Sequence, residues 1–385
     1  MTSEHQDGLI HGMGVEWVEP QWPRITLADA RAVLANFPEV GAVDALLWHS
    51  PRPFSAAAKV ACTHRTVLIK RYDIRVRNLL DLQQEHGFAQ ALRDQGVPLP
   101  IFYADHQGHT AFEQDGWVYE VQHLAQGEDW YQDAQSWTPF LQSSHAFAAG
   151  KALGQLHLAA RAYCAPERAT RLLVGGAYLL LSDDPIQALD DWQQGCPALS
   201  SYLSERDWRT DWQRHIAPFW PALQAVRPRL TPLWTHNDWH ASNLLWQDDE
   251  QGVRVVSVLD LGLSNRTFAL YDVATAIERN CLAWLNSDEG YPVTVDWSGL
   301  DQLLRGYKAT HGLTHQDCQA LAAVLPLVHL EFALSEVDYF MGVVGQRTDA
   351  DLAYDGYFLG HCQWFSSADG RQVLRFIEQF CSPCE

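Results

Sequence analysis

Residues 236–262 constrain this chain more than any other segment. Positions 236–243 read His-Asn-Asp-Trp-His-Ala-Ser-Asn, so the carboxylate of Asp238 stands five residues before the amide of Asn243, and a second carboxylate, Asp260, follows a valine-rich stretch. Amide and carboxylate oxygens are hard ligands of the kind that Mg²⁺ takes beside phosphate oxygens. The other carboxylate can orient an acceptor hydroxyl and take its proton. The segment therefore indicates phosphoryl transfer from a magnesium nucleotide.

We assign Asp238 as the catalytic base, and Asn243 and Asp260 as Mg²⁺ ligands. The alternative is that Asp238 and Asn243 only cap a turn, as Asp and Asn often do, but the ordered pattern favours the chemical interpretation. His236 is expected to brace the loop by hydrogen bonding. Asp272, which opens a helix in the pattern Leu-Tyr-Asp-Val-Ala, is expected to bond to the same loop, with simple N-capping as the alternative.

The composition predicts a large ordered core and limits the partners. The 385 residues are 47% hydrophobic and include sixteen Trp, and this length suits two or three domains or one two-lobed enzyme. The formal net charge of −20 argues against nonspecific nucleic-acid binding and against docking on anionic lipid. It would suit a cationic small-molecule acceptor, although solubility alone also accounts for an acidic surface.

The start of the chain and the cysteines indicate a cytoplasmic protein. Residues 1–7 are polar and lack the basic and apolar parts of a signal peptide, and no uninterrupted apolar run approaches membrane-spanning length. The eight Cys are scattered, which suits reduced thiols. Cys381 and Cys384 form a C-x-x-C pair that we interpret as incidental, with a redox or metal role as the less favoured alternative.

The order of the expected elements predicts an α+β fold. Val, Ile and turn residues indicate a small antiparallel meander over 43–72 and another strand at 117–121. A helix is expected over 76–95, where Gly-Val-Pro-Leu-Pro then breaks the pattern. From about residue 140 onward the pattern is mainly helical and is interrupted once, at 244–262, by a β-hairpin.

This organisation divides the chain into two lobes, a small β-rich one and a larger helical one. Residues 1–122 would form a small β-rich nucleotide-binding lobe, with 1–40 as an extension whose placement the sequence leaves open. Residues 123–385 would form the larger helical lobe with the catalytic loop and the acceptor site. Catalytic groups are common on such loops when a rigid scaffold holds them.

Lys70 and Glu85 are predicted to form a buried ion pair. Lys70 ends a Val-Leu-Ile-Lys strand that resembles the Val-Ala-Ile-Lys strand of protein kinases, where the lysine holds the α- and β-phosphates. Glu85 shares a helical face with Leu82 and Phe88, so it should point inward, where a carboxylate needs a partner. The alternative is that Glu85 reaches the surface at the edge of its helix.

The order of these motifs resembles the aminoglycoside phosphotransferase and choline-kinase-like superfamily, which shares the protein-kinase fold. The family's loop has the form His-Gly-Asp-x-His-x-x-Asn, and Asn237 stands here in place of the Gly. The family's metal motif is similar to the Asp-Leu-Gly at 260–262, and its Gly-x-x-Leu-x-x-Leu-His helix is similar to residues 150–157. The resemblance covers about residues 40–290 and implies a small-molecule kinase that uses ATP and Mg²⁺.

The resemblance also implies where the nucleotide binds. The backbone of the connector around His123 and Ala125 would bind adenine. The segment 50–58, which would cover the phosphates, contains no Gly, although Gly eases the approach of backbone N–H groups to phosphate. Ser55 and its neighbours are expected to take over this function.

The acceptor pocket is expected in the helical lobe. Glu331 and Asp338 are seven residues apart and would share one helical face, with Glu336 between them. His240 and Arg266 are further candidates, because they follow the base and the metal turn. Acidic groups would suit an amino sugar, an aminoglycoside or another amine, and a solvated helix face is the alternative.

Three other interpretations stay open. The homoserine-kinase-like and stress-response protein-kinase-like branches of the same superfamily differ only in the acceptor. A metallohydrolase would use His236 and His240, which have the spacing of two ligands on one helical face, but it leaves Lys70 and Asn243 unexplained. A non-catalytic nucleotide-binding scaffold has little support, because neither the base nor a ligand is missing. The sequence does not identify the acceptor, the choice between ATP and GTP, or the oligomeric state.

Overall fold

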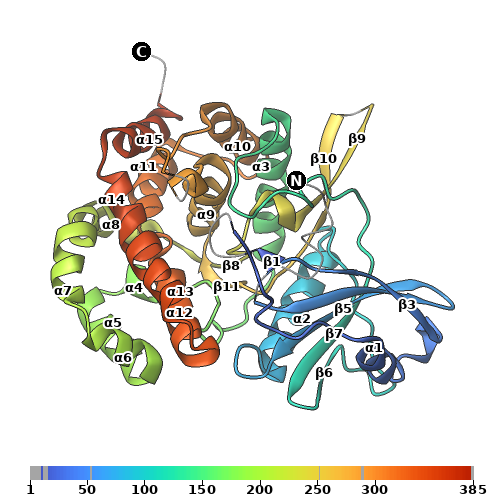
Figure 1. Ribbon diagram of the computed structural model, residues 1–385. Helices are drawn as coiled ribbons and strands as arrows, with labels where there is room; N and C mark the ends of the chain where they lie inside the picture. Colours follow the sequence, from blue (N-terminus) through green and yellow to red (C-terminus); the bar gives the residue numbers. More distant parts are fainter. Residues whose placement is uncertain (1–9, 12–15, 53, 251, 288–289, 383–385) are drawn as a thin grey trace.

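The N-terminal part of the chain is built on one antiparallel sheet (Figure 1). The computed structural model describes residues 10–11, 16–52, 54–250, 252–287 and 290–382. Five strands pair in the order β3-β4-β5-β7-β6, which confirms the predicted meander and the predicted strand that follows it. The bounds of these strands are β3 (Val43–His49), β4 (Ala56–Cys62), β5 (Thr66–Asp73), β6 (Ala111–Gln114) and β7 (Trp117–His123).

Two helices cover opposite faces of this sheet. Side chains alternate between the faces along a strand, so Ile69 of β5 packs with α1 (Leu27–Leu34), whereas Tyr72 packs with α2 (Leu79–Asp94). α2 is the helix that the sequence predicts after the meander. Residues 25–40, whose placement the sequence leaves open, pack on the sheet through their apolar side chains.

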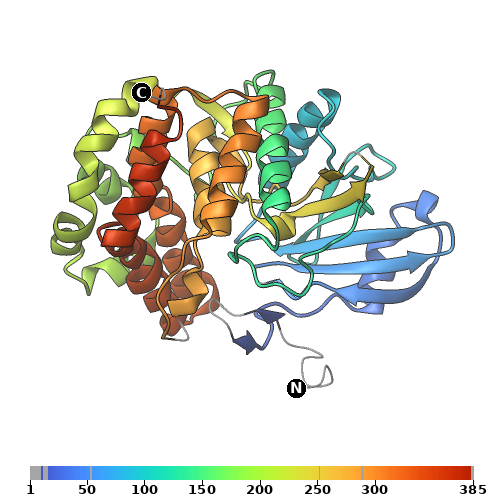
Figure 2. The same cartoon turned by 90° about the horizontal axis from the view of Figure 1, so that it is seen from above.

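The remainder of the chain is mainly helical and lies beside the sheet (Figure 2), which confirms the α+β, protein-kinase-like fold class. Short 3₁₀ and π turns join several of the helices. The α-helices are α3 (Ser143–Ala160), α4 (Tyr178–Leu181), α5 (Pro185–Gln194), α6 (Pro197–Ser204), α7 (Trp208–Asp211), α8 (Trp220–Val226), α9 (Ala269–Cys281), α10 (Trp297–Thr310), α11 (His315–Val324), α12 (Leu330–Tyr339), α13 (Arg347–Asp351), α14 (Gly360–Phe365) and α15 (Ala368–Gln379).

Short strands inside the helical part hold the segment 236–262. β9 and β10 are the predicted hairpin, whereas the sequence pattern does not indicate β8 and β11, because four residues are too few to show alternation. At the ends of these strands, the N–H of Leu259 donates to the C=O of Asn243 at 2.8 Å, which joins the loop to the turn. The pairs are β8 (Pro232–Thr235) with β11 (Asn265–Phe268), β9 (Leu244–Asp249) with β10 (Gly252–Val258), and, near the N-terminus, β1 (Ile10–His11) with β2 (Trp17–Val18).

Helices α3 and α10 cross at close range because two glycines face the other helix. A Cβ at Gly150 or at Gly306 would overlap a backbone carbonyl oxygen of the neighbouring helix. The close crossing brings His157 of α3 to Tyr307 of α10, where the ring Nδ1 lies 2.9 Å from the phenolic oxygen. The helix at 150–157 therefore serves to place a buried histidine.

One helical stretch, residues 315–344, is long and apolar enough to cross a membrane by length and composition alone. Its most apolar window is buried entirely inside the protein, where it forms part of the core. The sequence shows no uninterrupted apolar run here, because Glu331 and Glu336 interrupt it.

The cysteines of the described residues are free thiols. Cys381 donates its S–H to the C=O of Leu313 at 3.2 Å. Its partner in the C-x-x-C pair, Cys384, lies outside the described residues.

Replacing Gly150 with Ala is expected to destabilise the protein. The added Cβ would overlap backbone rather than a flexible side chain, so α3 and α10 would have to separate, which typically costs about 1–3 kcal/mol. Chemical denaturation would measure the loss in the free energy of unfolding. Gly195→Ala is the matched control, because the nearest atom to its Cβ would be 3.7 Å away. Equal stability of both variants would contradict the close crossing.

Candidate active site

One pocket lies between the sheet and the helical part, and it collects most of the predicted chemistry. Its open volume is about 1100 Å³. The loop and the turn contribute Asp238, His240, Asn243 and Asp260 to its lining, and the segment between β3 and β4 contributes Ser55. The structure therefore brings the predicted base, both predicted metal ligands and the predicted phosphate-covering residue to one place.

Asp238 is held by two neighbours. The amide nitrogen of Asn243 donates to its carboxylate Oδ2 at 2.9 Å and to its backbone carbonyl at 3.0 Å. Buried Arg279 of α9 forms an ion pair with Oδ1 of the same carboxylate. His240 lies nearby, with Nε2 3.5 Å from Oδ1, and its burial, with a further contribution from Arg52, lowers its pKa to about 3. A neutral imidazole and an immobilised carboxylate thus face the pocket together.

The backbone of the loop is held by Asp272. This carboxylate is fully buried and accepts the N–H groups of His236 and Asn237, each at 2.8 Å. Its Oδ2 also lies 3.1 Å from Nε2 of His157. Burial alone would raise the pKa of Asp272, but the hydrogen bonds and the neighbouring histidines lower it below its ordinary value. The predicted bond from Asp272 to the loop is confirmed.

His236 and Asn237 shape the loop from within. Nε2 of His236 lies 2.9 Å from the C=O of Leu259, and Nδ1 accepts the N–H of Asp238 at 3.2 Å, so the predicted bracing by hydrogen bonds is confirmed. Asn237 has a φ of 63°, a left-handed conformation that Asn tolerates better than most residues. Its side-chain oxygen accepts a hydrogen bond from the hydroxyl of Thr235 at 2.7 Å. Asn can therefore stand where the family has Gly.

Asp260 meets the sheet at Lys70. The ammonium nitrogen of Lys70 lies 3.0 Å from Oδ2 of Asp260, and the N–H of Gly262 donates to Oδ1 at 3.2 Å. Although burial would raise the pKa of Asp260, Lys70 and the backbone N–H lower it to about 2. Its side chain is 40% exposed, toward the pocket. An ionised carboxylate is thus presented to whatever occupies the pocket.

The predicted ion pair between Lys70 and Glu85 is wrong. Glu85 is buried as predicted, but its Oε1 lies 3.0 Å from Arg77 and 2.9 Å from Arg168. Both guanidinium groups also donate to the C=O of Gly262, at 2.7 and 3.0 Å. Glu85 therefore holds the turn at 260–262 through two arginines, and the partner of Lys70 is Asp260.

The sequence alone does not identify the partners of Glu85, because more than one cationic side chain could pair with it. Arg168 is 83 residues away in the chain, so no local spacing connects the two. The carboxylate beside Lys70 on the neighbouring strand is Glu120, whose Oε2 lies 2.7 Å from Nε2 of His86. The register between β5 and β7 places Glu120 opposite Lys70. This register cannot be predicted from the sequence of one strand.

Part of the backbone of the connector that follows β7 is already hydrogen-bonded within the protein. The N–H of His123 donates to the C=O of Ile101 at 2.8 Å, and its ring stacks on Tyr103 with centroids 4.0 Å apart. The amide of His123 is therefore not free for adenine. Ala125 follows in a segment without regular secondary structure and is half-buried.

The structure does not bring three predicted acceptor residues to the pocket of Asp238. Glu331 accepts the N–H of Leu179 at 2.7 Å, and Asp338 accepts the N–H of Leu199 at 3.0 Å, so each supports the start of a helix. Arg266 is exposed on β11. These three residues therefore do not share a pocket with Asp238, contrary to the expectation.

A different face of α12 lines the pocket. Phe332 and Glu336 are four residues apart and point to it together, whereas Glu331 and Asp338 share another face, as helical spacing requires. Oε2 of Glu336 is buried without a hydrogen-bond partner. Burial raises the pKa of Glu336 to about 8, against the opposing effect of Arg279.

Arg279 and Trp137 are pocket residues that sequence reasoning missed. The guanidinium of Arg279 lies over the rings of Trp137 and Phe332, at 5.0 and 5.3 Å from their centroids. Arg279 lies in α9 beside Glu278, and both charged side chains are buried; charged residues within a largely apolar helix were the available signal.

The geometry opposes a metal site at His236 and His240. The two residues lie in a non-helical loop, so the i, i+4 spacing does not place them on one helical face. Both ring nitrogens of His236 already have partners, as described above. Its lone pair is therefore not available to a metal, and we do not propose the metallohydrolase.

Lys70 of the sheet thus contacts Asp260 of the helical part beside a pocket that also holds the immobilised carboxylate of Asp238, and this combination is typical of a two-lobed phosphotransferase. Residues 54–310, about two thirds of the chain, match the model of the phosphotransferase enzyme family. The chain belongs to this family, and it is a small-molecule phosphotransferase with an alcohol group as acceptor.

Solved structures share the fold at low sequence identity. A microcompartment-associated aminopropanol kinase is 17% identical, with a TM-score of 0.55, over 90% of this chain and 99% of the other. An aminoglycoside phosphotransferase from Alicyclobacillus acidocaldarius is 14% identical, with a TM-score of 0.51, over 89% of this chain and 96% of the other. An amicoumacin kinase in complex with AMP-PNP, Ca²⁺ and its substrate is 12% identical, with a TM-score of 0.50, over 91% and 93%. No curated protein matches the sequence significantly.

Glu336 is expected to make stability depend on pH. The folded protein keeps a proton on Glu336 up to a pKa of about 8, whereas the unfolded chain releases it near the ordinary value of 4.5. The folded state therefore binds more protons between these values, so stability falls as pH rises through this window. Glu336→Gln should remove this dependence and change the stability difference from wild type by on the order of 5 kcal/mol between pH 4 and pH 9.

Chemical denaturation of both proteins across this pH range would measure the effect. Glu331→Gln is the control for the other buried carboxylate of α12, whose pKa is raised to about 7. Parallel pH profiles for wild type and Glu336→Gln would contradict the burial of an unpartnered carboxyl at Glu336.

Proposed function

We propose that this phosphotransferase moves the γ-phosphate of ATP to a hydroxyl of a small, amine-bearing molecule and requires Mg²⁺. The observation that carries the proposal is that Asp238, Asn243 and Asp260 line one pocket while Lys70 of the sheet contacts Asp260. Residues 1–122 would serve as the nucleotide-binding lobe and 123–385 as the lobe that supplies the base and the acceptor site. We also propose that the enzyme acts in the cytoplasm.

Lys70 would position the nucleotide phosphates from the floor of the sheet. Asn243 and Asp260 would hold Mg²⁺, whose charge would offset that of the transferring phosphoryl group. The donor set fits this ion, because an amide and an ionised carboxylate that is open to the pocket are hard oxygen ligands. Ser55 would contact the phosphates, and the connector at Ala125 would receive adenine, since the amide of His123 is engaged.

Asp238 would orient the acceptor hydroxyl for in-line attack and take its proton. Asn243 and Arg279 hold its two oxygens, so the carboxylate needs no reorganisation when the acceptor arrives. Arg279 also keeps a positive charge beside it, which favours the ionised form. Positioning and charge stabilisation would provide most of the rate gain.

The acceptor would lie between Asp238 and Glu336. Trp137 and Phe332 supply aromatic walls, and the unpartnered oxygen of Glu336 offers an acidic or hydrogen-bonding contact for an amine. The aminopropanol and amicoumacin kinases support an amine-bearing acceptor by their names. The homoserine-kinase-like and stress-response protein-kinase-like branches would place another hydroxyl at the same base, so only an acceptor panel separates them.

Asp238→Asn is expected to abolish transfer and leave nucleotide binding almost unchanged. Removing a base that acts only on the reacting hydroxyl should lower kcat by about 10²–10⁴-fold. Transfer from Mg·ATP and Mg·GTP would be measured by mass spectrometry across amino alcohols, aminoglycosides, amino sugars, choline, homoserine and a generic protein. Calorimetry would give the nucleotide Kd.

Asp248→Asn, at an exposed position of β9, is the matched control and should keep full turnover. Undiminished turnover of Asp238→Asn would show that the base is assigned wrongly. Absence of both nucleotide binding and transfer in the wild type would contradict the proposed ATP-dependent reaction.

Glu336→Gln is expected to weaken acceptor binding selectively. If Glu336 contacts an amine, the acceptor KM should rise about 10-fold or more, whereas the KM for ATP should stay within about 2-fold, since a hydrogen bond to a charged group contributes about 1.5–3 kcal/mol. Steady-state kinetics with the best acceptor of the panel would measure both constants. Glu331→Gln is the control on the same helix, and an equal rise in its acceptor KM would contradict the pocket face of α12.

A further inference from the structure

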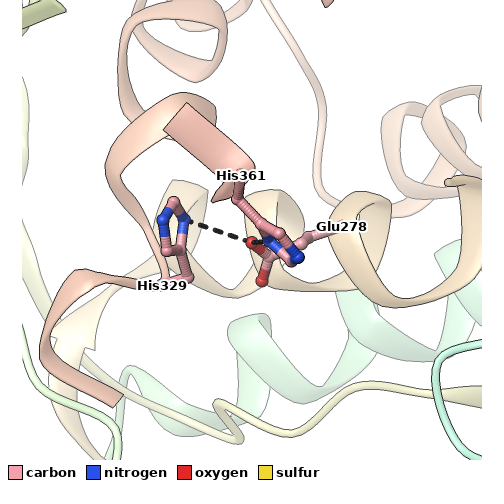
Figure 3. Close-up of side chains that lie close together, drawn as sticks. All are labelled: Glu278, His329 and His361. Atoms are coloured by element: carbon pink, nitrogen blue, oxygen red, sulfur yellow. Dashed lines mark hydrogen bonds and ion pairs between the residues drawn. The ribbon is translucent and has the colours of Figure 1, made fainter. Parts of the chain in front are cut away.

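A second cluster of chemically capable side chains lies outside the pocket, in the helical core. Glu278 of α9, His329 at the start of α12 and His361 of α14 meet there, as Figure 3 shows. Oε1 of Glu278 lies 2.9 Å from Nδ1 of His361 and 3.2 Å from Nδ1 of His329. All three residues are at most 7% exposed by side chain. Each comes from a different helix, so the contact is a product of the tertiary fold.

His329 has a buried ring nitrogen without a hydrogen-bond partner. Nδ1 faces Oε1 of Glu278 at 3.2 Å, but the two atoms form no hydrogen bond. On the other side of the ring, Nε2 lies 3.3 Å from the C=O of Phe358 and 3.8 Å from Sγ of Cys362. A buried polar atom is costly without a partner, and a cation between Nδ1 and Oε1 would provide one.

Two other buried histidines that contact a carboxylate have partners for both ring nitrogens. Nδ1 of His157 has the hydroxyl of Tyr307 as its partner, and Nε2 has Asp272. Nδ1 of His86 has the hydroxyl of Thr110, and Nε2 has Glu120. Nδ1 of His329, in contrast, forms no hydrogen bond with the carboxylate that it faces.

The chemistry of the three side chains suits metal ligation. Glu278 offers a carboxylate oxygen and the two histidines each offer a ring nitrogen, and the three ligand atoms lie within 4.8 Å of one another. A metal takes carboxylate and imidazole ligands in their deprotonated forms, so its binding would release any proton held between them.

We propose that Glu278, His329 and His361 bind a divalent transition metal of the zinc type. Zinc binds to two histidines and one glutamate in sites that keep a fourth position for water, and two ligand atoms on one tetrahedral zinc stand about 3.3 Å apart. The separations of 2.9 and 3.2 Å agree with this value, and all three ligand atoms lie within 4.8 Å of one another. Small ring rotations bring them around one ion.

The surroundings of the two histidine rings suit such a site. A metal-binding imidazole commonly donates its other N–H to a carbonyl or carboxylate, which fixes the ring. The contact of Nε2 with Phe358 does this for His329. The ring of His361 is fixed by stacking on Trp284, with centroids 3.5 Å apart. A bound ion would tie α9, α12 and α14 together behind the catalytic loop, because the next residue after Glu278 is Arg279, the partner of Asp238.

The test is the metal content of the full-length protein. Because the site is buried, the ion should load during folding. Protein expressed in zinc-supplemented medium and dialysed is expected to hold about one zinc per chain by elemental analysis. Removal of the zinc by a chelator in denaturant, followed by refolding with and without zinc, should give a Tm several degrees higher with the metal. Refolding with Co²⁺ should give the visible absorption of a tetrahedral ion without a thiolate charge-transfer band.

Variants separate this site from other sources of metal. Glu278→Gln and His361→Gln should reduce the zinc content to below about one tenth. His86→Gln breaks another buried histidine–carboxylate contact and should leave the zinc content unchanged, as should the double change Cys381→Ser and Cys384→Ser. Wild-type protein that holds no zinc, and shows neither the Tm shift nor the Co²⁺ absorption, would overturn the proposal without any variant having to fold. Zinc that is lost only in the cysteine variant would overturn it as well. Neither result depends on phosphoryl transfer, so the kinase proposal is judged separately.

Discussion

The buried carboxylate of Asp272 is the interaction on which the site depends most directly. It accepts two backbone N–H groups of the catalytic loop and contacts His157, which in turn contacts Tyr307. A buried carboxylate is stable only when its lone pairs are satisfied, so the loop must adopt the conformation that points both N–H groups inward. The left-handed conformation at Asn237 follows, and Asp238 is directed to the pocket. The close crossing of α3 and α10 at Gly150 is what puts His157 and Tyr307 within reach.

A second network of buried charges fixes the turn at 260–262. Glu85 pairs with Arg77 and Arg168, and both arginines hold the carbonyl of Gly262. Removing one partner of such a network leaves an uncompensated buried charge, which costs far more than the intact pairs contribute. The network leaves Lys70 free of Glu85 and available to Asp260. The lysine therefore contacts the carboxylate of the turn directly. Glu85 of α2 supports the same turn through Arg77 and Arg168.

The sequence predicts those parts of the fold and site that depend on local spacing. The strands of the N-terminal sheet, α2, the hairpin and the pattern from Asp238 to Asp260 all have periods or fixed separations that a single segment displays. The pairing of Glu85 with Arg168 has no such local signal, because Arg168 comes from a distant segment of the chain. Strand register and helix placement bring Arg168, and not Lys70, to Glu85. β8 and β11 are too short for a pattern, and they become strands only because they pair with each other.

The side chains of α12 show a second limit of prediction from the sequence. Glu331, Glu336 and Asp338 lie on one helix, and the sequence alone establishes that Glu331 and Asp338 share a face, but not which face is turned to the pocket. The structure turns Phe332 and Glu336 inward, and it uses Glu331 and Asp338 to support the starts of neighbouring helices. Successive side chains are rotated by about 100° around a helix axis, so Glu331 and its neighbour Phe332 point in different directions. The residues of the loop and the turn follow one another at fixed spacing, so their pattern can be read from the chain. The orientation of α12 is instead set by its packing against α6, α13 and the π turns at 340–344 and 352–359, and no motif records it.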